Sequence, residues 1–242
     1  MSVRRIPFVW KQIGFILYIV LLAPLIFSVI RSGYLYTFDS DELTHVQIVY
    51  HMAHGKLPYI SFFSIYTPIF HWFLTPVFQL AGFTIDALYA GRLLMIIVFG
   101  LRVVMATTLV YLVFDQYLAL LFAALFLLDP FTVFNGMQIR PDNLMMLLFT
   151  AGLVALLVGL RRRRSGAVLL AGMLISGALV TSIKIVPSIG VVAVFLLWHA
   201  LRDRHRETFW VFLAGLVLPI LMFLFYFAVQ GTLGTMLLHI LV

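Results

Sequence analysis

Apolar runs of close to 20 residues recur along this chain, separated by short polar segments. A helix needs roughly 20 apolar residues to cross a bilayer, because lipid offers no partner for its backbone N–H and C=O groups. The chain is 64% hydrophobic and only 10% charged, whereas a soluble domain is about half apolar and about a quarter charged. The sequence therefore predicts an all-α, polytopic membrane protein, with one transmembrane module over residues 1–242 and no soluble domain.

Seven of the apolar runs are predicted to span the membrane. They are about 12–31, 87–114, 116–134, 141–160, 166–182, 184–201 and 208–229. An eighth run, 61–83, is long enough to cross but contains Pro68, Pro76 and many aromatic residues. Aromatic rings prefer the membrane–water interface, so this run is predicted to form a juxtamembrane amphipathic helix within the first outer loop, 32–86.

The arrangement of basic residues sets the predicted topology. Three basic clusters stand at Arg4/Arg5/Lys11, at Arg161–Arg164 and at Arg202/Arg204/Arg206. Short cytoplasmic segments are enriched in Lys and Arg, so all three are placed inside, which requires an even number of crossings between them. Leaving out 61–83 gives four crossings and then two. One long helix over 166–201 would instead put the last two clusters on opposite sides.

The N-terminus imitates a signal peptide, because basic residues precede the apolar run 13–30. That run is long for a signal peptide and no cleavage site follows it, so it is predicted to be an uncleaved first span. The predicted location is the bacterial inner (plasma) membrane, with a cytoplasmic N-terminus and an extracytoplasmic acidic loop. The net charge of +7 follows from the cytoplasmic clusters and does not indicate a nucleic-acid partner. The absence of cysteine excludes disulfides and thiolate metal sites.

Acidic residues concentrate directly after the first span. Asp39, Asp41 and Glu42 are three of the chain's nine carboxylates, and His45 follows one helical turn after Asp41. A helix N-cap needs one such carboxylate. Three can also hold a general base or bind a divalent cation, Mg or Mn. Asp41, Glu42 and Asp39 are therefore the candidate catalytic residues and the candidate metal ligands.

Several cations are predicted to lie on the same outer side as the acidic loop. Charged groups at membrane depth usually face a cavity or a partner. Arg92, Arg140, Lys184 and His45 are therefore the candidate groups for binding a lipid phosphate. Each has a structural alternative. Arg92 can pair with Asp86, Arg140 can pair with Asp142, and a histidine near the interface is often only hydrogen-bonded.

The acidic loop "FDSDELTHVQIVYHMAHGKLPYISFF" resembles the first outer loop of the integral-membrane GT-C glycosyltransferases, which include protein O-mannosyltransferases and the aminoarabinose transferases of lipid A. The segments "GRLLMIIVFGLRVV", "MQIRPDNLMMLLFTAGLVALL" and "TSIKIVPSIG" also look like spans and outer turns of that family. The resemblance implies a GT-C-like core and a polyprenyl-phosphate-linked sugar donor. It implies inverting transfer outside the membrane, with Asp41 as the general base.

Two departures from the family pattern leave alternatives open. The second juxtamembrane segment reads "FFSIYTP" where acidic or histidine residues are common in bacterial relatives, and family members are generally much longer. The chain is thus a truncation, a minimal enzyme, or one subunit of a complex or homo-oligomer. A non-catalytic scaffold that binds a lipid phosphate or a partner protein is the main alternative. A transporter or flippase ranks lower, because only Arg102 is plainly mid-span.

Overall fold

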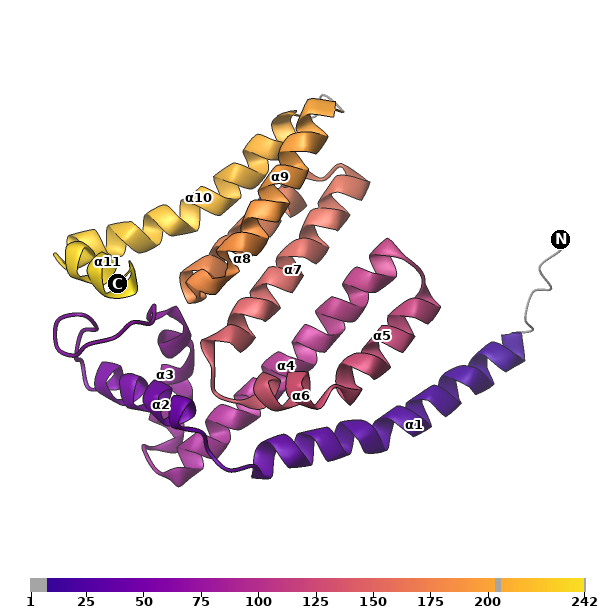
Figure 1. The fold of residues 1–242 in the computed structure, drawn as a ribbon, viewed down its shortest axis with the longest axis horizontal. Coiled ribbons are helices and arrows are strands. Elements are labelled where there is room, and N and C mark those ends of the chain that lie inside the picture. The colour runs from indigo at the N-terminus through magenta and orange to yellow at the C-terminus, as the bar shows by residue number, and fades with distance from the viewer. Residues whose placement is uncertain (1–7, 203–205, 242) are drawn as a thin grey trace.

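The computed structural model describes residues 8–202 and 206–241 (Figure 1). Within these ranges the chain is helical and has no β-strand, which confirms the predicted all-α class. The helices are α1 (Phe8–Leu35), α2 (Ser40–Ala53), α3 (Ile69–Ala81), α4 (Ile85–Val113), α5 (Gln116–Leu128), α6 (Pro130–Met137), α7 (Pro141–Arg162), α8 (Ser165–Thr181), the 3-10 turn η1 (Ile183–Ile185), α9 (Val186–Arg202), α10 (Arg206–Val229) and α11 (Leu233–Leu241).

Five segments of the described chain are long and apolar enough to cross a membrane. They are Ile16–Leu35 in α1, then α4, α7, Ile183–Arg202 and α10. The pair α5 and α6 makes a sixth if it is one bent span, and α8 is a shorter apolar helix of 17 residues. The predicted number of about seven therefore requires that both the bent pair and α8 also cross.

The predicted span over 116–134 is two helices, bent by 72° at their junction. The reason is local. The carboxylate of Asp129 accepts hydrogen bonds from the backbone N–H groups of Phe131 and Thr132, so it caps a new helix there. Pro130 occupies the first position of that helix, where its missing N–H costs nothing. The Asp-Pro pair therefore starts a second helix within the predicted span.

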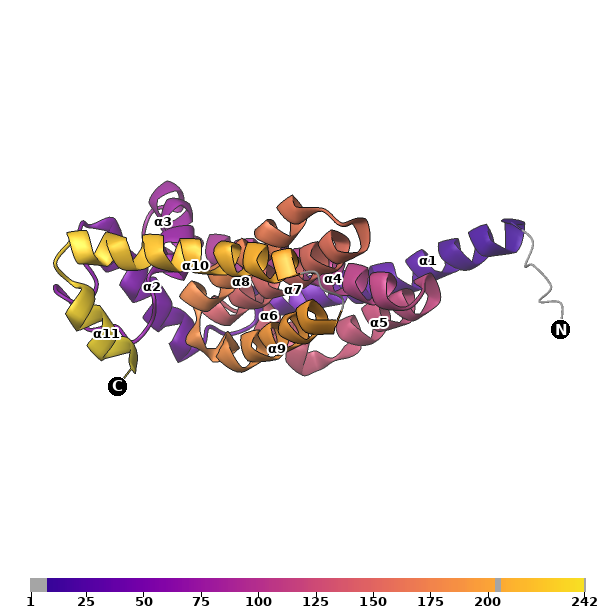
Figure 2. The same ribbon diagram turned by 90° about the horizontal axis from the view of Figure 1, so that it is seen from above.

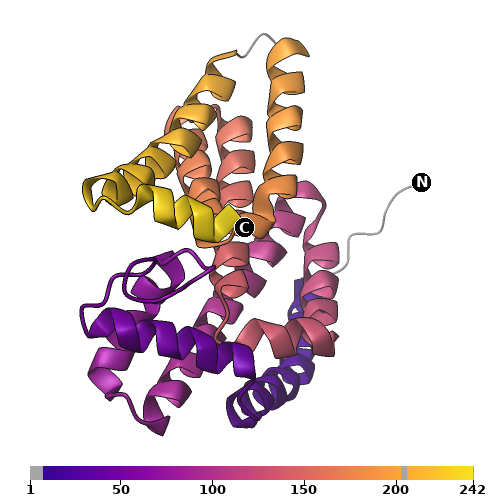
Figure 3. The same cartoon turned by 60° about the vertical axis from the view of Figure 1, so that its left-hand side comes forward.

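The run 61–83 does not form a long helix. Only α3 is helical, with 13 residues, and that is shorter than a span. Its buried face, Phe70, Leu74 and Phe78, packs against α2 and against Ala87 and Met95 of α4 in one apolar cluster. The helices α2 and α3 thereby sit at one end of the bundle, with α11 nearby (Figure 2), and α2 runs across the helix ends (Figure 3).

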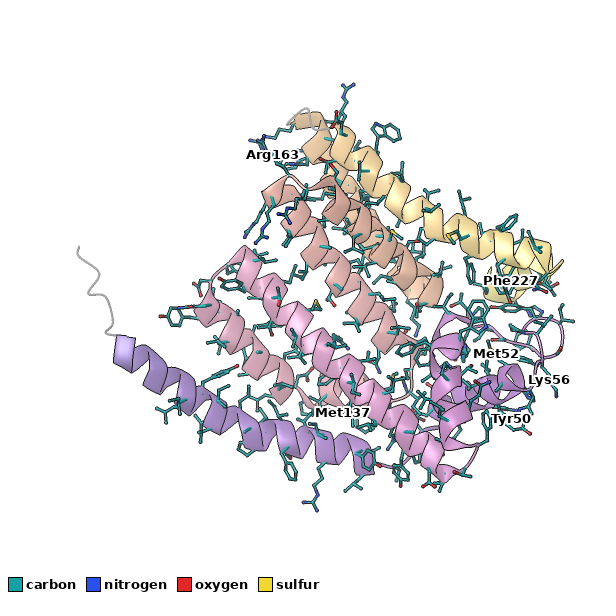
Figure 4. All side chains as sticks on the ribbon, turned by 180° about the vertical axis from the view of Figure 1, so that it is seen from behind. Tyr50, Met52, Lys56, Met137, Arg163 and Phe227 are labelled. Atoms are coloured by element: carbon teal, nitrogen blue, oxygen red, sulfur yellow. The ribbon has the colours of Figure 1, made fainter. Side chains whose placement is uncertain are left out.

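The chain reverses direction between α8 and α9, as the prediction of two separate spans over 166–182 and 184–201 requires (Figure 1). The α-helix ends at Thr181, and the turn η1 leads into α9. As a consequence Arg163 and Arg164 on one side and Arg206 on the other line the same hollow of about 810 Å³. These basic clusters therefore share one end of the bundle, opposite to Tyr50 and Lys56 of the first outer loop (Figure 4). Residues 1–7, which hold two of the three N-terminal basic residues, lie outside the described range.

Small residues allow α8 and α10 to cross in close contact. A side chain at Gly172 would meet the carbonyl oxygen of Phe212 at 2.3 Å, and one at Gly215 would meet that of Leu169 at the same distance. Membrane helices commonly associate in this way, because lipid gives no hydrophobic driving force and close packing must supply the attraction. This contact fixes the half of the bundle that begins with α7. The acidic end combines α2 and α4 with the start of α7 and the turn η1.

Candidate active site

The acidic residues lie at the N-terminus of helix α2. Asp39 adopts an extended conformation at the N-cap of α2, and its backbone N–H donates to Glu42 Oε2 at 3.1 Å. This is one half of a capping box, in which the third helical residue reaches back to the cap. Asp41 and Glu42, one residue apart, consequently point in different directions. Glu42 turns toward the protein and is 0% exposed, whereas Asp41 turns outward and its side chain is 53% exposed.

Glu42 and Arg92 form a buried, two-pronged ion pair. Arg92 Nε donates to Glu42 Oε1 at 3.0 Å and Nη2 donates to Oε2 at 2.6 Å. The backbone N–H of Ile139 also donates to Oε1 at 3.0 Å. Both oxygens of Glu42 are therefore occupied by groups 50 and 97 residues away in sequence. A carboxylate held in this way links α2, α4 and the start of α7.

The rest of the Arg92 guanidinium is also satisfied. Its Nη1 and Nη2 donate to the backbone carbonyls of Tyr36 and Thr37, where α1 ends, with Nη2 at 2.9 Å from Thr37 O. The ring of Phe38 covers it at 3.9 Å from the centroid. Arg92 is 1% exposed. This side chain therefore binds the orphan carbonyls of a helix end, and it has no contact with Asp86, the partner that the sequence suggested.

Asp39 and Asp41 share a second arginine. Arg140 Nη2 lies 2.6 Å from Asp39 Oδ2 and 3.1 Å from Asp41 Oδ2. Its hydrogen bond holds the pKa of the Asp39 carboxyl below its usual range. Unlike the Glu42–Arg92 pair, this cluster faces outward, with the Asp39 side chain 37% exposed and that of Arg140 25% exposed. Arg140 Nε is buried without a hydrogen-bond partner, so the guanidinium keeps a donor unused. Part of the Arg140 side chain is therefore open to the outside, although the unpartnered Nε is itself buried.

Lys184 completes the charged end of the bundle. Its Nζ lies 2.9 Å from Asp142 Oδ2, which joins the turn after α8 to the first turn of α7. The sequence had suggested Arg140 as the partner of Asp142, but the structure pairs Arg140 with Asp39 and Asp41 instead. Lys184 is 68% exposed, and Asp142 Oδ1 lacks a hydrogen bond. The lysine is thus held loosely at the surface.

His45 lies beneath the exposed carboxylates and is paired with a residue that sequence reasoning missed. Its Nδ1 is 3.1 Å from Nε2 of His71 in α3, and the ring of Tyr66 lies edge-on at 4.6 Å between centroids. Burial lowers the pKa of His45 to about 4, an effect reduced by the Asp41 charge and reinforced by Arg140. Burial, with the neighbouring His45, lowers the pKa of His71 to about 3. Both rings are therefore neutral at pH 7.

The spacing of the apolar residues in α3 indicates that His71 is buried. The positions 71, 74 and 78 fall on one face of the helix, and Leu74 and Phe78 are buried. A histidine among such residues needs a polar partner inside the protein. His45 occupies the corresponding buried face of α2 with Val49. Each pattern predicts a buried histidine that needs a polar partner. Neither pattern alone shows that the partner is the other histidine.

Asp39, Asp41 and Glu42, the candidate metal ligands, do not converge on one point in this structure, because Glu42 is buried while Asp41 faces outward. Among the described residues, no group of three or more His, Asp or Glu side chains is arranged to hold a metal ion. The reason is that Glu42 is turned inward and saturated by Arg92 and the Ile139 amide. Asp39 and Asp41 instead converge on the same guanidinium nitrogen. A cation there would have to displace Arg140.

Residues 66–227, about two thirds of the chain, match the family model described as dolichyl-phosphate-mannose-protein mannosyltransferase. The matched range includes Arg92, Arg140 and Lys184 and begins after the acidic residues 39–42. No curated protein and no solved structure matches the chain.

Proposed function

The chain belongs to the dolichyl-phosphate-mannose-protein mannosyltransferase family, and from this premise we propose that it is a membrane glycosyltransferase that takes its sugar from a polyprenyl-phosphate donor. The observation that carries the proposal is the outward-facing cluster at one end of the helical bundle. There Asp39 and Asp41 meet Arg140, and Lys184 pairs with Asp142, two residues after Arg140 in the chain. This arrangement supports the proposal because it combines carboxylates that can accept a proton with cations that can bind a phosphate.

Arg140 and Lys184 bind the donor phosphate in this proposal. An arginine fork matches two phosphate oxygens, and cations stabilise the charge that grows on a departing phosphate. In the structure the single positive charge of Arg140 is shared between the two aspartates. Arrival of the phosphate draws Arg140 away from them, and Asp41 then becomes free. Arg92 is left out of the phosphate site, because its donors are already bound to Glu42 and to the end of α1.

Asp41 acts as the general base in a single inverting displacement. The acceptor hydroxyl oxygen attacks the anomeric carbon from the Asp41 side while the bond from that carbon to the phosphate oxygen breaks. The hydroxyl proton passes to Asp41, and polyprenyl phosphate leaves with the bonding electron pair. Asp39 holds Arg140 between turnovers, and Glu42 fixes the start of α2 so that Asp41 faces outward. Glu42 is thus a positioning residue rather than a catalytic one.

The acidic end of the bundle faces the extracytoplasmic side in this proposal, and the hollow lined by Arg163, Arg164 and Arg206 faces the cytoplasm. The chain has no cysteine, so single cysteines report orientation without background. In intact cells a membrane-impermeant maleimide should label Lys56→Cys and spare Arg162→Cys. The reverse pattern would invert the topology.

Donor use is tested on the protein extracted in native lipid and supplied with a synthetic polyprenyl-phosphate mannose carrying a radiolabelled sugar. We expect native mass spectrometry to show one bound molecule of the polyprenyl-phosphate mannose donor. As the sugar is transferred, the protein should release polyprenyl phosphate. Arg140→Ala should weaken donor binding at least tenfold, whereas Arg31→Ala, an exposed arginine of α1, should not. A protein that binds no such lipid would favour the scaffold alternative.

A further inference from the structure

A pocket of about 300 Å³ opens beside the aspartate cluster, between α2 and the loop that precedes α3. The α2 wall presents Thr44, Gln47 and His51, and the loop wall presents Phe62, Phe63 and Tyr66. Neither the donor site nor the buried ion pair uses these side chains. The pocket lies in the first outer loop, outside the apolar segments that can cross the membrane.

The pocket begins one helical turn from the proposed base. Thr44, Gln47 and His51 recur at the three- and four-residue spacing of one helix face, and Asp41 stands three residues before Thr44 on the same side. Three residues advance a helix by about 4.5 Å. A molecule seated in the pocket can therefore place one hydroxyl against Asp41 while the rest of it remains between α2 and the loop.

The loop wall is held rigidly before any ligand arrives. Tyr59 adopts a left-handed conformation with φ of 71°, its backbone N–H donates to Phe62 O at 3.1 Å, and its hydroxyl donates to Tyr66 O at 2.7 Å. Tyr59 itself is only 3% exposed. Walls that are ordered in advance reduce the entropy lost on binding. The pocket is therefore suited to a specific small group.

The chemistry of the walls combines aromatic faces with hydrogen-bonding groups. The His51 ring lies against that of Phe62 at 5.2 Å between centroids, and its Nδ1 is buried without a hydrogen-bond partner. Gln47 and Thr44 are exposed; the Gln47 amide offers donors and an acceptor, whereas the Thr44 hydroxyl donates to Ser40 O and offers only its acceptor lone pairs. A sugar ring has the complementary surface, with C–H groups on its faces and hydroxyls around its rim. Pockets for small polar ligands typically have this mixed lining.

We propose that this pocket binds the acceptor and that the acceptor is a saccharide, a free glycan end or a sugar of a glycolipid headgroup. Its volume is that of roughly ten liquid water molecules, enough for one ring. One ring hydroxyl reaches Asp41, loses its proton to that carboxylate and forms the new glycosidic bond as polyprenyl phosphate departs. The proposal rests on the glycosyltransferase function and adds the acceptor class to it.

The test is saturation-transfer NMR on the nanodisc-reconstituted protein with methyl glycosides of mannose, glucose, galactose and arabinose, beside a Ser/Thr-rich peptide. At least one glycoside should bind, and Gln47→Ala and His51→Phe should each weaken it at least fivefold. The matched control is Gln79→Ala, an exposed glutamine of α3 that does not line the pocket, and it should bind like the parent.

Every variant is first checked for polyprenyl-phosphate binding, which separates the two proposals. Failure of the parent to bind that lipid counts against the glycosyltransferase function. Normal lipid binding with the peptide bound in place of every glycoside overturns the saccharide acceptor. Equal glycoside binding by Gln47→Ala, His51→Phe and Gln79→Ala would overturn the pocket assignment.

Discussion

Two arginine–carboxylate clusters involve the acidic residues 39–42. They differ in burial and in how completely their hydrogen-bonding groups are occupied. The Glu42–Arg92 pair is buried, and its guanidinium and carboxylate are bound by partners from four parts of the chain. The pair formed by Arg140 with Asp39 and Asp41 is partly exposed and keeps an unused donor. The first can only hold the fold together. In the proposed mechanism the second exchanges its partner for the donor phosphate.

The largest effect should come from breaking the buried pair. Arg92→Ala leaves Glu42 charged and without its main partner, and breaking one side of a buried ion pair costs about 3–5 kcal/mol. We expect the free energy of SDS-induced unfolding in micelles to fall by about that amount, with low membrane expression. Arg31→Ala, at an exposed arginine of α1, is the control. An unchanged unfolding free energy for Arg92→Ala would show that the Glu42–Arg92 pair does not stabilise the fold.

Breaking the exposed pair should give the opposite profile. Arg140→Ala removes a group that stabilises the leaving phosphate, and loss of one such group typically lowers the rate by about 100-fold, roughly 2.7 kcal/mol in the barrier. The thermal unfolding midpoint should change little, because exposed ion pairs contribute little to stability. Sugar-transfer assays and unfolding scans on the same preparation check both parts. A variant that is unstable yet fully active per folded molecule would reverse the comparison.

The histidine pair beneath the cluster predicts a pH dependence of stability. The folded pKa values of about 4 for His45 and about 3 for His71 lie below the unfolded value of about 6.5. The unfolded chain therefore binds more protons below pH 6.5, and the stability present above that pH is lost toward pH 4. The slope is up to about 1.4 kcal/mol per unit and group. The double variant His45→Asn/His71→Asn should flatten the unfolding-versus-pH curve, and an unaltered slope would show that the two histidines do not cause the pH dependence.

The smallest effect should follow removal of divalent ions. Asp39 and Asp41 already share Arg140 as their ion-pair partner, and Glu42 cannot join them as a third carboxylate. We therefore propose that transfer does not require Mg or Mn, and we expect EDTA treatment to leave the rate within about twofold of the untreated enzyme, a barrier change below about 0.5 kcal/mol. A loss of activity that Mg restores would show that a cation displaces Arg140 during turnover.

The sequence was sufficient to locate the charged end of the molecule. Hydrophobic run length predicted the membrane class, and the parity of basic clusters predicted that α8 and α9 form a hairpin with both basic segments at one end. The same reasoning brought Asp39, Asp41 and Arg140 to one side. These inferences succeeded because they depend on bilayer thickness and on charge placement, both of which are encoded locally.

The different positions of Asp41 and Glu42 could not be derived from hydrophobic run length and charge placement. Asp41 and Glu42 are adjacent and chemically alike, and their different fates depend on Arg92 and on the Ile139 amide, which only the fold brings near. The bend at Asp129 was also missed, because an apolar run hides a helix start when hydropathy alone is read. His71 escaped notice because its partner, His45, lies on another helix.

The most direct test of Asp41 as the base and Glu42 as a positioning residue is the side-by-side measurement of sugar transfer and unfolding for Asp41→Asn and Glu42→Gln. Both changes remove one negative charge with almost no change in shape. We predict that Asp41→Asn lowers transfer by about 10²–10⁴-fold, the range of general-base catalysis, with a normal unfolding midpoint. Glu42→Gln should chiefly destabilise the protein and retain transfer per folded molecule. Full transfer by a folded Asp41→Asn protein would contradict the assignment of Asp41 as the base.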